Sequence, residues 1–274
     1  MTDRYAVIGN PIAHSKSPLI HTAFARALGE DIEYTRIEGP LDGFAAAALA
    51  FRDALGKGLN VTVPFKVQAF ELATDRHEAA RIAGAANALK FTGSRIEAEN
   101  FDGVGLVHDI ERNLGVSLRG RRVLCLGAGG AVRGAVPPIL ARATTEVVIA
   151  NRTVATAQTL AGQFSARGRV TACGYTDLAH EQGFDVVING TSASLNAVLP
   201  PVPAAVFGNA ALAYDMVYGK GLTPFLRLAR EAGAARCADG VGMLVEQAAE
   251  AFVWWRGVRP DTRPVIDQLT VPLA

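Results

Sequence analysis

The sequence predicts an α/β protein of two domains, and three observations lead to this prediction. The chain has 274 residues, which is enough for two domains of ordinary size. Short apolar strands alternate with helical stretches, a pattern typical of mostly parallel sheets covered on both faces. The alternation runs in two series, with a break near residues 100–120. We therefore expect each series to form its own sheet.

The first series begins with a strand at residues 5–10 and a helix at 17–28. The apolar residues of this helix repeat at helical spacing: Ile20, Phe24, Ala27 and Leu28. Ser17 is placed to cap the helix and Gly29 to end it. Further strands are predicted at residues 32–38, 59–63 and 87–91, and residues 90–98 resemble a short hairpin.

The second series contains short apolar strands and ends with a long helical stretch. The strands are predicted at residues 121–127, 146–151, 168–173, 184–189 and 211–216. The helical stretch follows at residues 242–258, with apolar side chains along one face. It must pack on one of the two domains, and its own pattern leaves both open.

Composition and charge argue against several classes of protein. Lys and Arg number 27 and Asp and Glu number 26, so the net charge of +1 disfavours nucleic acid or an anionic membrane as partner. No apolar run approaches the roughly 18 residues of a membrane span, and the N-terminus does not resemble a secretion signal. Three widely spaced cysteines, without zinc-site spacing, favour a cytoplasmic setting and no bound metal. We expect a cytoplasmic protein that binds a small molecule.

A glycine-rich turn follows the first strand of the second series. Gly127, Gly129 and Gly130 stand between an apolar strand and a helical pattern. Glycine at these positions lets the backbone approach a pyrophosphate, which binds the free N–H groups at the start of a helix. Val132 occupies the place of the third glycine in the usual dinucleotide fingerprint. An ordinary strand-to-helix turn is therefore the alternative interpretation.

The end of the next strand indicates which dinucleotide is bound. NAD-binding proteins place an acidic residue about 20 residues after the glycine turn, where it binds the ribose. Asn151, Arg152 and Thr153 occupy that point here, with no acid among them. An arginine between two small polar residues suits a 2′-phosphate, so the sequence favours NADP over NAD. The alternative is that Arg152 is a solvated residue at the start of a helix.

Polar side chains accompany the strand that ends near residue 63. Asn60 and Thr62 are expected on the face opposite Val61 and Val63, because side chains alternate along a strand. Pro64 ends this strand, and Lys66 follows shortly after it. We therefore expect an amide, a hydroxyl and an ammonium group to lie together at the C-terminal end of this buried strand.

Lys66 and Asp102 are the candidate catalytic pair. An enzyme that reduces a carbonyl with a nicotinamide needs a proton donor beside the carbonyl oxygen, and Lys66 is the candidate donor. Asp102, at the junction of the two series, is the candidate carboxylate that holds the ammonium in place. The alternatives are a solvated lysine at a helix start and an aspartate that caps a helix.

Eight segments together resemble one known family. They are GNPIAHSKSP, NVTVPFK, AGAANAL, NFDGVGL, LGAGGAVRG, NRT, YDMVYGKGLTPF and ADGVGMLVEQAAEAF. In order and spacing they are similar to shikimate dehydrogenases, over residues 4–267. That family reduces 3-dehydroshikimate to shikimate with NADPH, in the pathway to aromatic amino acids. The resemblance implies a substrate-binding domain at residues 1–103, a Rossmann-like NADP-binding domain at 104–237, and a C-terminal segment at 238–274 that returns to the first domain.

The resemblance also implies roles for individual residues around the substrate. Ser15 and Ser17 would hold the substrate carboxylate at the start of a helix. Lys66 would be the general acid in reduction and the base in oxidation, with Asp102 as its partner and as a hydroxyl ligand. The other implied ligands are Asn60, Thr62 and Asn87 for the ring hydroxyls, and Tyr218 and Gln247, which would close the pocket.

For the cofactor, the resemblance implies three groups of residues. The pyrophosphate would lie against Gly127, Ala128, Gly129, Gly130 and Ala131, and the 2′-phosphate against Asn151, Arg152 and Thr153. The backbone at Met216, Val217 and Gly240 would line the nicotinamide. Glu78 matches an acidic position near the cofactor cleft.

Three positions depart from the family pattern. Phe101 and Ala88 replace threonines beside the implied substrate site, and Thr156 replaces a second arginine after Arg152. Because a site that binds a hydroxyl discriminates strongly, the first two changes leave open a dehydrogenase for quinate or a related polyol acid. A binding or regulatory protein without turnover is the third interpretation. The missing arginine is expected to weaken the preference for NADP. The sequence is compatible with a monomer or a homodimer.

Overall fold

The computed structural model describes residues 2–181 and 183–273, and the chain divides into two compact units. The first unit comprises Met1–Gly105 and Val245–Val265, and the second comprises Leu106–Leu244 and Ile266–Ala274. The sequence placed all of residues 238–274 with the first domain, whereas the contacts assign only Val245–Val265 to it. Residues 237–239 add a strand to the second sheet, and Leu273 packs against the core of that unit, which explains the difference.

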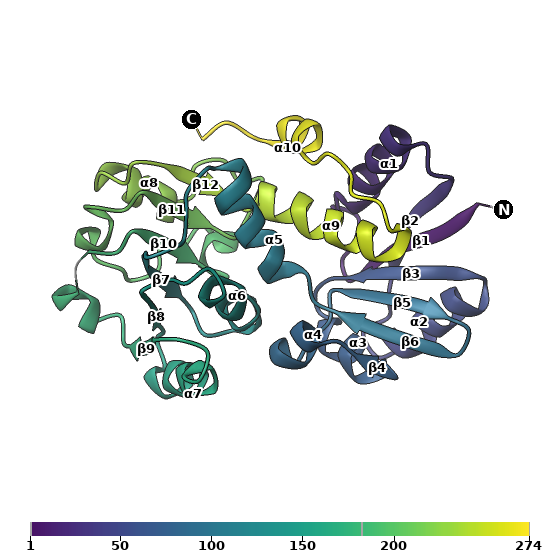
Figure 1. Ribbon diagram of the computed structural model, residues 1–274, viewed down its shortest axis with the longest axis horizontal. Helices are drawn as coiled ribbons and strands as arrows, with labels where there is room; N and C mark the ends of the chain where they lie inside the picture. The colour runs from purple at the N-terminus through teal and green to yellow at the C-terminus, as the bar shows by residue number, and fades with distance from the viewer. Residues whose placement is uncertain (1, 182, 274) are drawn as a thin grey trace. The chain divides into compact units, whose positions relative to one another are not determined.

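The first unit contains a mixed sheet in the order β2-β1-β3-β5-β6-β4 (Figure 1). Its strands are β1 (Asp3–Gly9), β2 (Ile32–Glu38), β3 (Gly56–Val61), β4 (Asp75–Arg76), β5 (Ala88–Thr92) and β6 (Arg95–Glu99). β1 is parallel to β2 and β3, but β5 is antiparallel to both β3 and β6. The predicted hairpin is therefore present as β5–β6, and it makes this sheet mixed rather than mostly parallel.

Helices of the first unit include α1 (Ser17–Leu28), α2 (Phe44–Asp53), α3 (Lys66–Leu72) and α4 (Glu78–Ala83). The prediction that Ser17 caps α1 is wrong, because Lys16 occupies the cap position and Ser17 already lies in the first turn. Gly29 ends the helix in the left-handed conformation, with φ of 68°. The buried face of the helix includes His21 and Ala25, whereas Ala27 is exposed. The predicted apolar face was therefore partly wrong, although Ile20 and Phe24 are buried as expected.

The second unit contains a fully parallel sheet in the order β12-β11-β10-β7-β8-β9. Its strands are β7 (Arg122–Leu126), β8 (Glu146–Ala150), β9 (Val170–Cys173), β10 (Val186–Asn189), β11 (Leu212–Asp215) and β12 (Cys237–Asp239). The chain moves outward from β7 in one direction and then from β10 in the other. Ligands of such sheets bind at this reversal, beside the carboxyl ends of the strands.

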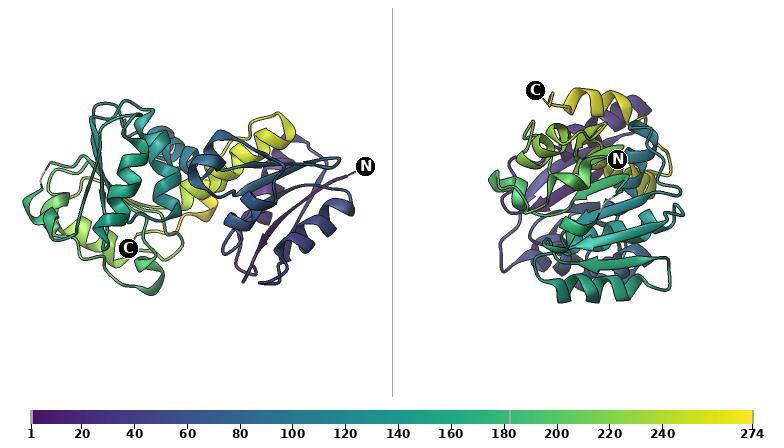
Figure 2. Two further views of the ribbon diagram at one scale, coloured as in Figure 1. Left: turned by 90° about the horizontal axis from the view of Figure 1, so that it is seen from below. Right: turned by 90° about the vertical axis from the view of Figure 1, so that its left-hand side faces the viewer.

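Helices of the second unit include α6 (Gly130–Leu140), α7 (Val154–Phe164) and α8 (Pro224–Glu231). Figure 2, in its right-hand view, looks onto this unit and shows its strands side by side, with α7 at the lower edge. Short 3₁₀ turns lie at Asp177–His180, Ala193–Asn196 and Ala204–Phe207. The turn at Ala193–Asn196 follows β10, so it lies at the reversal point.

Two helices belong partly to each unit. They are α5 (Asp102–His108), which continues as a π-helical turn at Asp109–Asn113, and α9 (Val241–Arg256). Gly105 allows α5 to approach α9 closely, because a Cβ there would lie 2.7 Å from the backbone nitrogen of Gln247. The last helix is α10 (Arg263–Leu269). None of the helices in the described parts of the chain is long and apolar enough to cross a bilayer.

Candidate active site

Lys66 and Asp102 form an ion pair in the first unit, although 36 positions separate them. Lys66 is the first residue of α3 and Asp102 the first of α5, and Nζ lies 2.6 Å from Oδ2. Their side chains are 31% and 17% exposed, so the pair is partly open to a ligand. The interpretation of Asp102 as a helix cap is wrong, since Asp102 is already the first residue of α5 and its two carboxylate oxygens accept from Lys66 and Asn87.

The amide of Asn87 holds the other side of this pair. Its Nδ2 donates to Oδ1 of Asp102 at 2.8 Å and to Oε1 of Gln247 at 3.0 Å, and its Oδ1 accepts from the backbone N–H of Phe101. Asn87 is almost fully buried, so these partners fix the orientation of its amide. The structure therefore brings Lys66, Asn87, Asp102 and Gln247 together in one hydrogen-bonded cluster.

Asn60 and Val61 face opposite sides of their strand, as predicted. Val61 packs in the core cluster that contains Ile8, whereas Asn60 bonds to Tyr34, which belongs to another cluster. Both residues are buried, at 5% and 2% exposure, while Val63, beyond the end of the strand, is 69% exposed. β3 ends at Val61, and both faces of the sheet are covered at that point. Tyr34 donates to Oδ1 of Asn60 at 2.6 Å, so the buried amide has a partner. Thr62 follows the strand end and is half-buried.

His21 packs against Tyr34, the hydrogen-bond partner of Asn60, and the sequence analysis missed it. The imidazole is fully buried and stacks on the Tyr34 ring, with centroids 4.3 Å apart. Burial lowers the pKa of His21 to about 3, so the ring is neutral at physiological pH. Burial also raises the pKa of Tyr34, which keeps its hydroxyl protonated as a donor to Asn60.

Ser15 and Ser17 lie at the start of α1. Their hydroxyl oxygens are 3.3 Å apart, and the backbone N–H of Ser17 donates to the hydroxyl of Ser15. The guanidinium of Arg36 donates to the carbonyl of Ser15 at 2.7 Å. A helix start beside a cation favours an anion. Arg36 was missed because its place beside these serines depends on the pairing of β2 with β1.

The sequence analysis also named Glu78 and Tyr218. Glu78 is the exposed first residue of α4. Tyr218 follows β11 in the second unit and is 39% exposed. Among the described residues, no group of three histidine, cysteine or carboxylate side chains is arranged to hold a metal ion.

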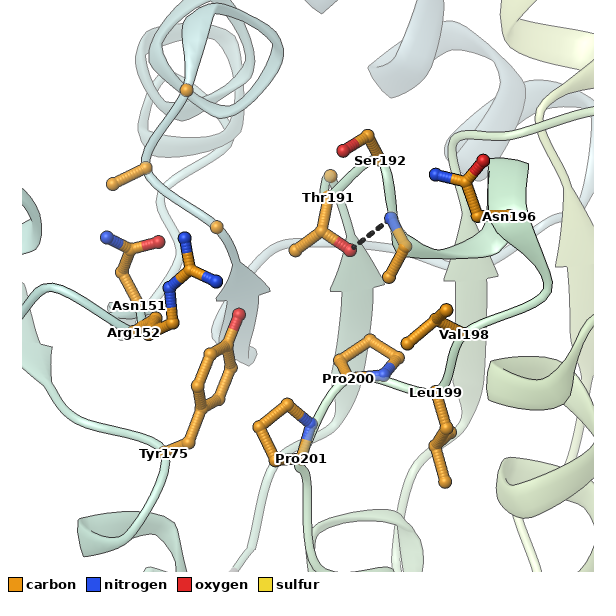
Figure 3. Close-up of a pocket in the computed structure, with 15 residues that line it drawn as sticks. Asn151, Arg152, Tyr175, Thr191, Ser192, Asn196, Val198, Leu199, Pro200 and Pro201 are labelled. Atoms are coloured by element: carbon orange, nitrogen blue, oxygen red, sulfur yellow. Dashed lines mark hydrogen bonds between the residues drawn. The ribbon is translucent and has the colours of Figure 1, made fainter.

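A cavity of about 650 Å³ opens in the second unit at the carboxyl ends of its strands (Figure 3). It is lined by Gly127, Ala128, Gly129, Asn151, Arg152, Tyr175, Gly190, Thr191, Ser192, Ala193, Asn196, Val198, Leu199, Pro200 and Pro201. The glycine turn and the Arg152 segment, which the sequence assigned to a dinucleotide, thus line one hollow. Gly130 and Ala131 begin α6 behind this turn, and Thr153 is the N-cap of α7.

The glycine turn fits a dinucleotide phosphate. Gly127 has φ of 97°, which a residue with a side chain rarely adopts. A Cβ on Gly129 or Gly130 would meet nothing within 4 Å, so open space adjoins the turn. No side chain caps α6 at Gly129, which leaves the N–H groups of its first turn available to a phosphate.

The segment after β11 is held by a buried carboxylate. Asp215 is fully buried and accepts from the hydroxyls of Ser194 at 2.6 Å and Thr223 at 2.8 Å. It also accepts from the side chain of Asn189 and the backbone N–H of Val217. Burial raises the pKa of Asp215, and these donors oppose that shift. One carboxylate thus joins the loop after β10 to the loop after β11.

Gly240 packs directly on the loop after β11. A Cβ at this position would lie 2.3 Å from the carbonyl oxygen of Met216, and the Gly240 N–H donates to the carbonyl of Val217. Only glycine fits this approach. Met216, Val217 and Gly240 therefore form one backbone cluster, as the sequence analysis grouped them.

Sequence reasoning missed much of the cavity wall. Thr191 and Ser192 follow β10, and Thr191 Oγ1 accepts from the backbone N–H of Ala193 at 3.3 Å (Figure 3). Their position directly after a predicted strand was the available signal, because the carboxyl ends of parallel strands share one edge. The same signal was available for Tyr175, which follows the predicted strand at residues 168–173, whereas residues 198–201 carried no comparable local pattern.

Three family models match the chain. A shikimate dehydrogenase substrate-binding domain matches residues 7–89, a shikimate/quinate 5-dehydrogenase domain matches 109–200, and a shikimate 5′-dehydrogenase C-terminal domain matches 240–270. Together these models cover most of the chain.

Curated relatives and solved structures agree with these matches. A shikimate dehydrogenase (NADP(+)) of Nitrosospira multiformis is 55% identical, covering 98% of both chains, and one of Alkalilimnicola ehrlichii is 56% identical, covering 98% of this chain and 99% of the relative. An Ael1 enzyme from Pseudomonas putida is 63% identical with a TM-score of 0.97 and full coverage of both chains. A shikimate 5-dehydrogenase of Thermus thermophilus, solved with NADP(H) and shikimate, is 31% identical with a TM-score of 0.85, covering 97% of this chain and 98% of that one. The chain belongs to the shikimate dehydrogenase family.

Proposed function

We propose that the protein is an NADP-dependent oxidoreductase that reversibly reduces 3-dehydroshikimate to shikimate, in aromatic amino acid biosynthesis. The observation that carries this proposal is the Lys66–Asp102 ion pair, in which Asp102 also accepts a hydrogen bond from Asn87. The pair occurs in a chain whose curated relatives, at 52–56% identity, are named shikimate dehydrogenase (NADP(+)).

Lys66 moves the proton in this reaction. In reduction its ammonium gives a proton to the ketone oxygen as that oxygen becomes a hydroxyl, and in oxidation the amine takes the proton back. Asp102 holds the ammonium at 2.6 Å and binds the same hydroxyl. NADPH, when bound, supplies the hydride to the ketone carbon.

The remaining residues bind and orient the substrate. Ser15 and Ser17 hold its carboxylate at the start of α1, where Arg36 adds positive charge. The ring hydroxyls are bound by Asn60, Thr62, Asn87 and Gln247. The first unit is thus the substrate-binding domain of the proposal.

The second unit is the NADP-binding domain of the proposal. The turn from Gly127 to Ala131 binds the pyrophosphate, and residues 151–153 bind the 2′-phosphate, with Arg152 as the cation. Met216, Val217 and Gly240 line the nicotinamide with backbone atoms.

A cytoplasmic location belongs to the same proposal. Cys125, Cys173 and Cys237 are all free thiols, as expected in a reducing compartment. The working unit is a monomer or a homodimer, with a small molecule as its partner.

A related polyol acid such as quinate is the second candidate substrate, which Phe101 and Ala88 leave open. The Phe101 ring packs edge-on against Trp254 in the first unit, with centroids 5.7 Å apart. Ala88 is fully buried in β5. Two positions where the family carries threonine therefore present no hydroxyl, which changes the wall beside Asn87 and Asp102.

A spectrophotometric assay tests the proposal. The purified protein is mixed with shikimate or quinate and with NADP⁺ or NAD⁺, and the absorbance of the reduced cofactor is followed. We expect shikimate with NADP⁺ to have the highest kcat/KM, by about tenfold or more, in line with hydroxyl recognition. Preference for quinate would establish the second candidate, and no turnover with any pair would refute catalysis.

A further inference from the structure

We infer that the hydroxyl of Tyr175 is a second donor to the 2′-phosphate of NADP in this chain. The inference rests on the proposed function, because it assigns a specificity-determining residue within the same cavity. Tyr175 was not among the residues that the sequence assigned to the cofactor.

The cavity lacks a second cation where one is expected. Arg152 is the only charged side chain among the described residues that line it. Thr156, where the family carries a second arginine, is an exposed residue of α7 and does not line it. A 2′-phosphate carries between one and two negative charges and three acceptor oxygens at neutral pH. Arg152 alone leaves acceptors for another donor.

The register of two strands places Tyr175 beside Arg152. Ala150 pairs with Cys173 at the ends of β8 and β9, and the backbone N–H of Asn151 donates to the carbonyl of Cys173. Tyr175 and Arg152 each lie two residues beyond this pair. Figure 3 shows the hydroxyl end of Tyr175 directed towards the Arg152 guanidinium on one side of the cavity.

The ring of Tyr175 is anchored while its hydroxyl faces the cavity. The side chain is half-buried and packs against the hydrophobic core of the second unit. Burial raises the pKa of Tyr175, and the positive charge of Arg152 opposes that rise. The phenol is therefore protonated at neutral pH and can donate its hydrogen. Together with the guanidinium it offers two kinds of donor to one phosphate.

Binding measurements on the whole chain, without substrate, test this role. Dissociation constants for NADP⁺, NAD⁺ and 2′,5′-ADP are measured by titration calorimetry for the wild type and for Tyr175→Phe, which keeps the ring. We expect Tyr175→Phe to raise the dissociation constants of NADP⁺ and 2′,5′-ADP by about tenfold, the usual effect of losing one hydrogen bond to a charged group. Binding of NAD⁺ should change by less than about twofold, since it has no group at that position.

A matched control and a rescue separate this role from a structural one. Tyr5 is a phenol that also neighbours an arginine, Arg256, but in the first unit, so Tyr5→Phe should leave all three constants unchanged. Adding Thr156→Arg to Tyr175→Phe should restore tight NADP⁺ binding and leave NAD⁺ binding as it was. Thermal unfolding of each variant reports whether the fold is retained.

The outcomes distinguish the inference from the proposed function. Unchanged NADP⁺ binding in Tyr175→Phe, or equal weakening of NADP⁺ and NAD⁺, would overturn the role of Tyr175 while shikimate oxidation by the wild type continued to support the proposed function. Wild-type protein that binds NADP⁺ no more tightly than NAD⁺ would overturn both the 2′-phosphate site and the inference.

Discussion

The side chain of Asn87 donates to Oδ1 of Asp102 over 2.8 Å, while Lys66 contacts Oδ2 of the same carboxylate. Both oxygens of Asp102 are therefore held, one by the first residue of α3 and the other by the residue before β5. A carboxylate fixed at two points cannot rotate freely, so the position of the lysine ammonium is fixed with it.

Removing the amide should loosen this arrangement. In Asn87→Ala the carboxylate keeps Lys66 but loses its second partner, and we expect kcat with shikimate to fall roughly 10–100-fold, as for other groups that orient catalytic side chains. Steady-state kinetics measure the change. Asn209→Ala, at an exposed position of the second unit, is the control and should be unchanged. An Asn87→Ala enzyme with normal kcat would show that the amide does not orient Asp102.

Removing the ammonium should separate turnover from binding. We expect Lys66→Ala to lose roughly 10²–10⁴-fold in kcat, the usual contribution of a general acid, while shikimate still binds in a calorimetric titration. Lys57→Ala is the control, because Lys57 is an exposed lysine of β3. Near-normal turnover of Lys66→Ala would remove this residue from the mechanism.

Removing the guanidinium should act on one cofactor only. We expect Arg152→Ala to raise the KM for NADP⁺ by about tenfold or more and the KM for NAD⁺ by less than about twofold, because only NADP⁺ carries a phosphate on its 2′-hydroxyl. Arg119→Ala, an exposed arginine outside the cavity, should leave both constants unchanged. Equal effects on the two cofactors contradict the assignment of Arg152.

Buried His21 should make stability fall in mild acid. Its pKa is lowered from 6.5 to about 3 in the folded protein, so the unfolded chain binds the proton first as the pH falls. The contribution of neutral His21 to the free energy of unfolding is intact above pH 6.5 and is lost progressively as the pH falls towards 3. Between pH 7 and pH 5 this amounts to about 2 kcal/mol in the free energy of unfolding.

Urea unfolding at the two pH values checks this loss. His21→Phe keeps an aromatic ring against Tyr34 but cannot bind a proton, so its stability should fall by about 2 kcal/mol less than that of the wild type. His14→Ala, at an exposed position, should follow the wild type. The same decrease in all three proteins would mean that His21 does not control the response to acid.

Features with a local pattern could be predicted from the sequence. The apolar strands β7 to β11 and the glycine turn at Gly127 were found because their residues carry the signal themselves. Lys66 and Asp102 were chosen by residue type and place along the chain. The 2.6 Å between them depends on the folding of α3 beside α5, which sequence spacing does not contain.

Features that depend on distant pairing were missed or misplaced. β4 and β12 have two and three residues, too few for a periodic pattern. Tyr175 lies beside Arg152 only because of the register of β9 on β8. The alternation predicted the face on which Asn60 lies, but its burial depends on the covering of both sides of the sheet, which the local pattern does not contain.

The Asp215 carboxylate has a consequence for how the second unit receives a ligand. Its hydrogen bonds to Ser194, Thr223 and Val217 fix the conformation of the segments after β10 and β11 before a ligand binds. A preorganised wall loses little conformational entropy on association, so more of the interaction energy appears as affinity.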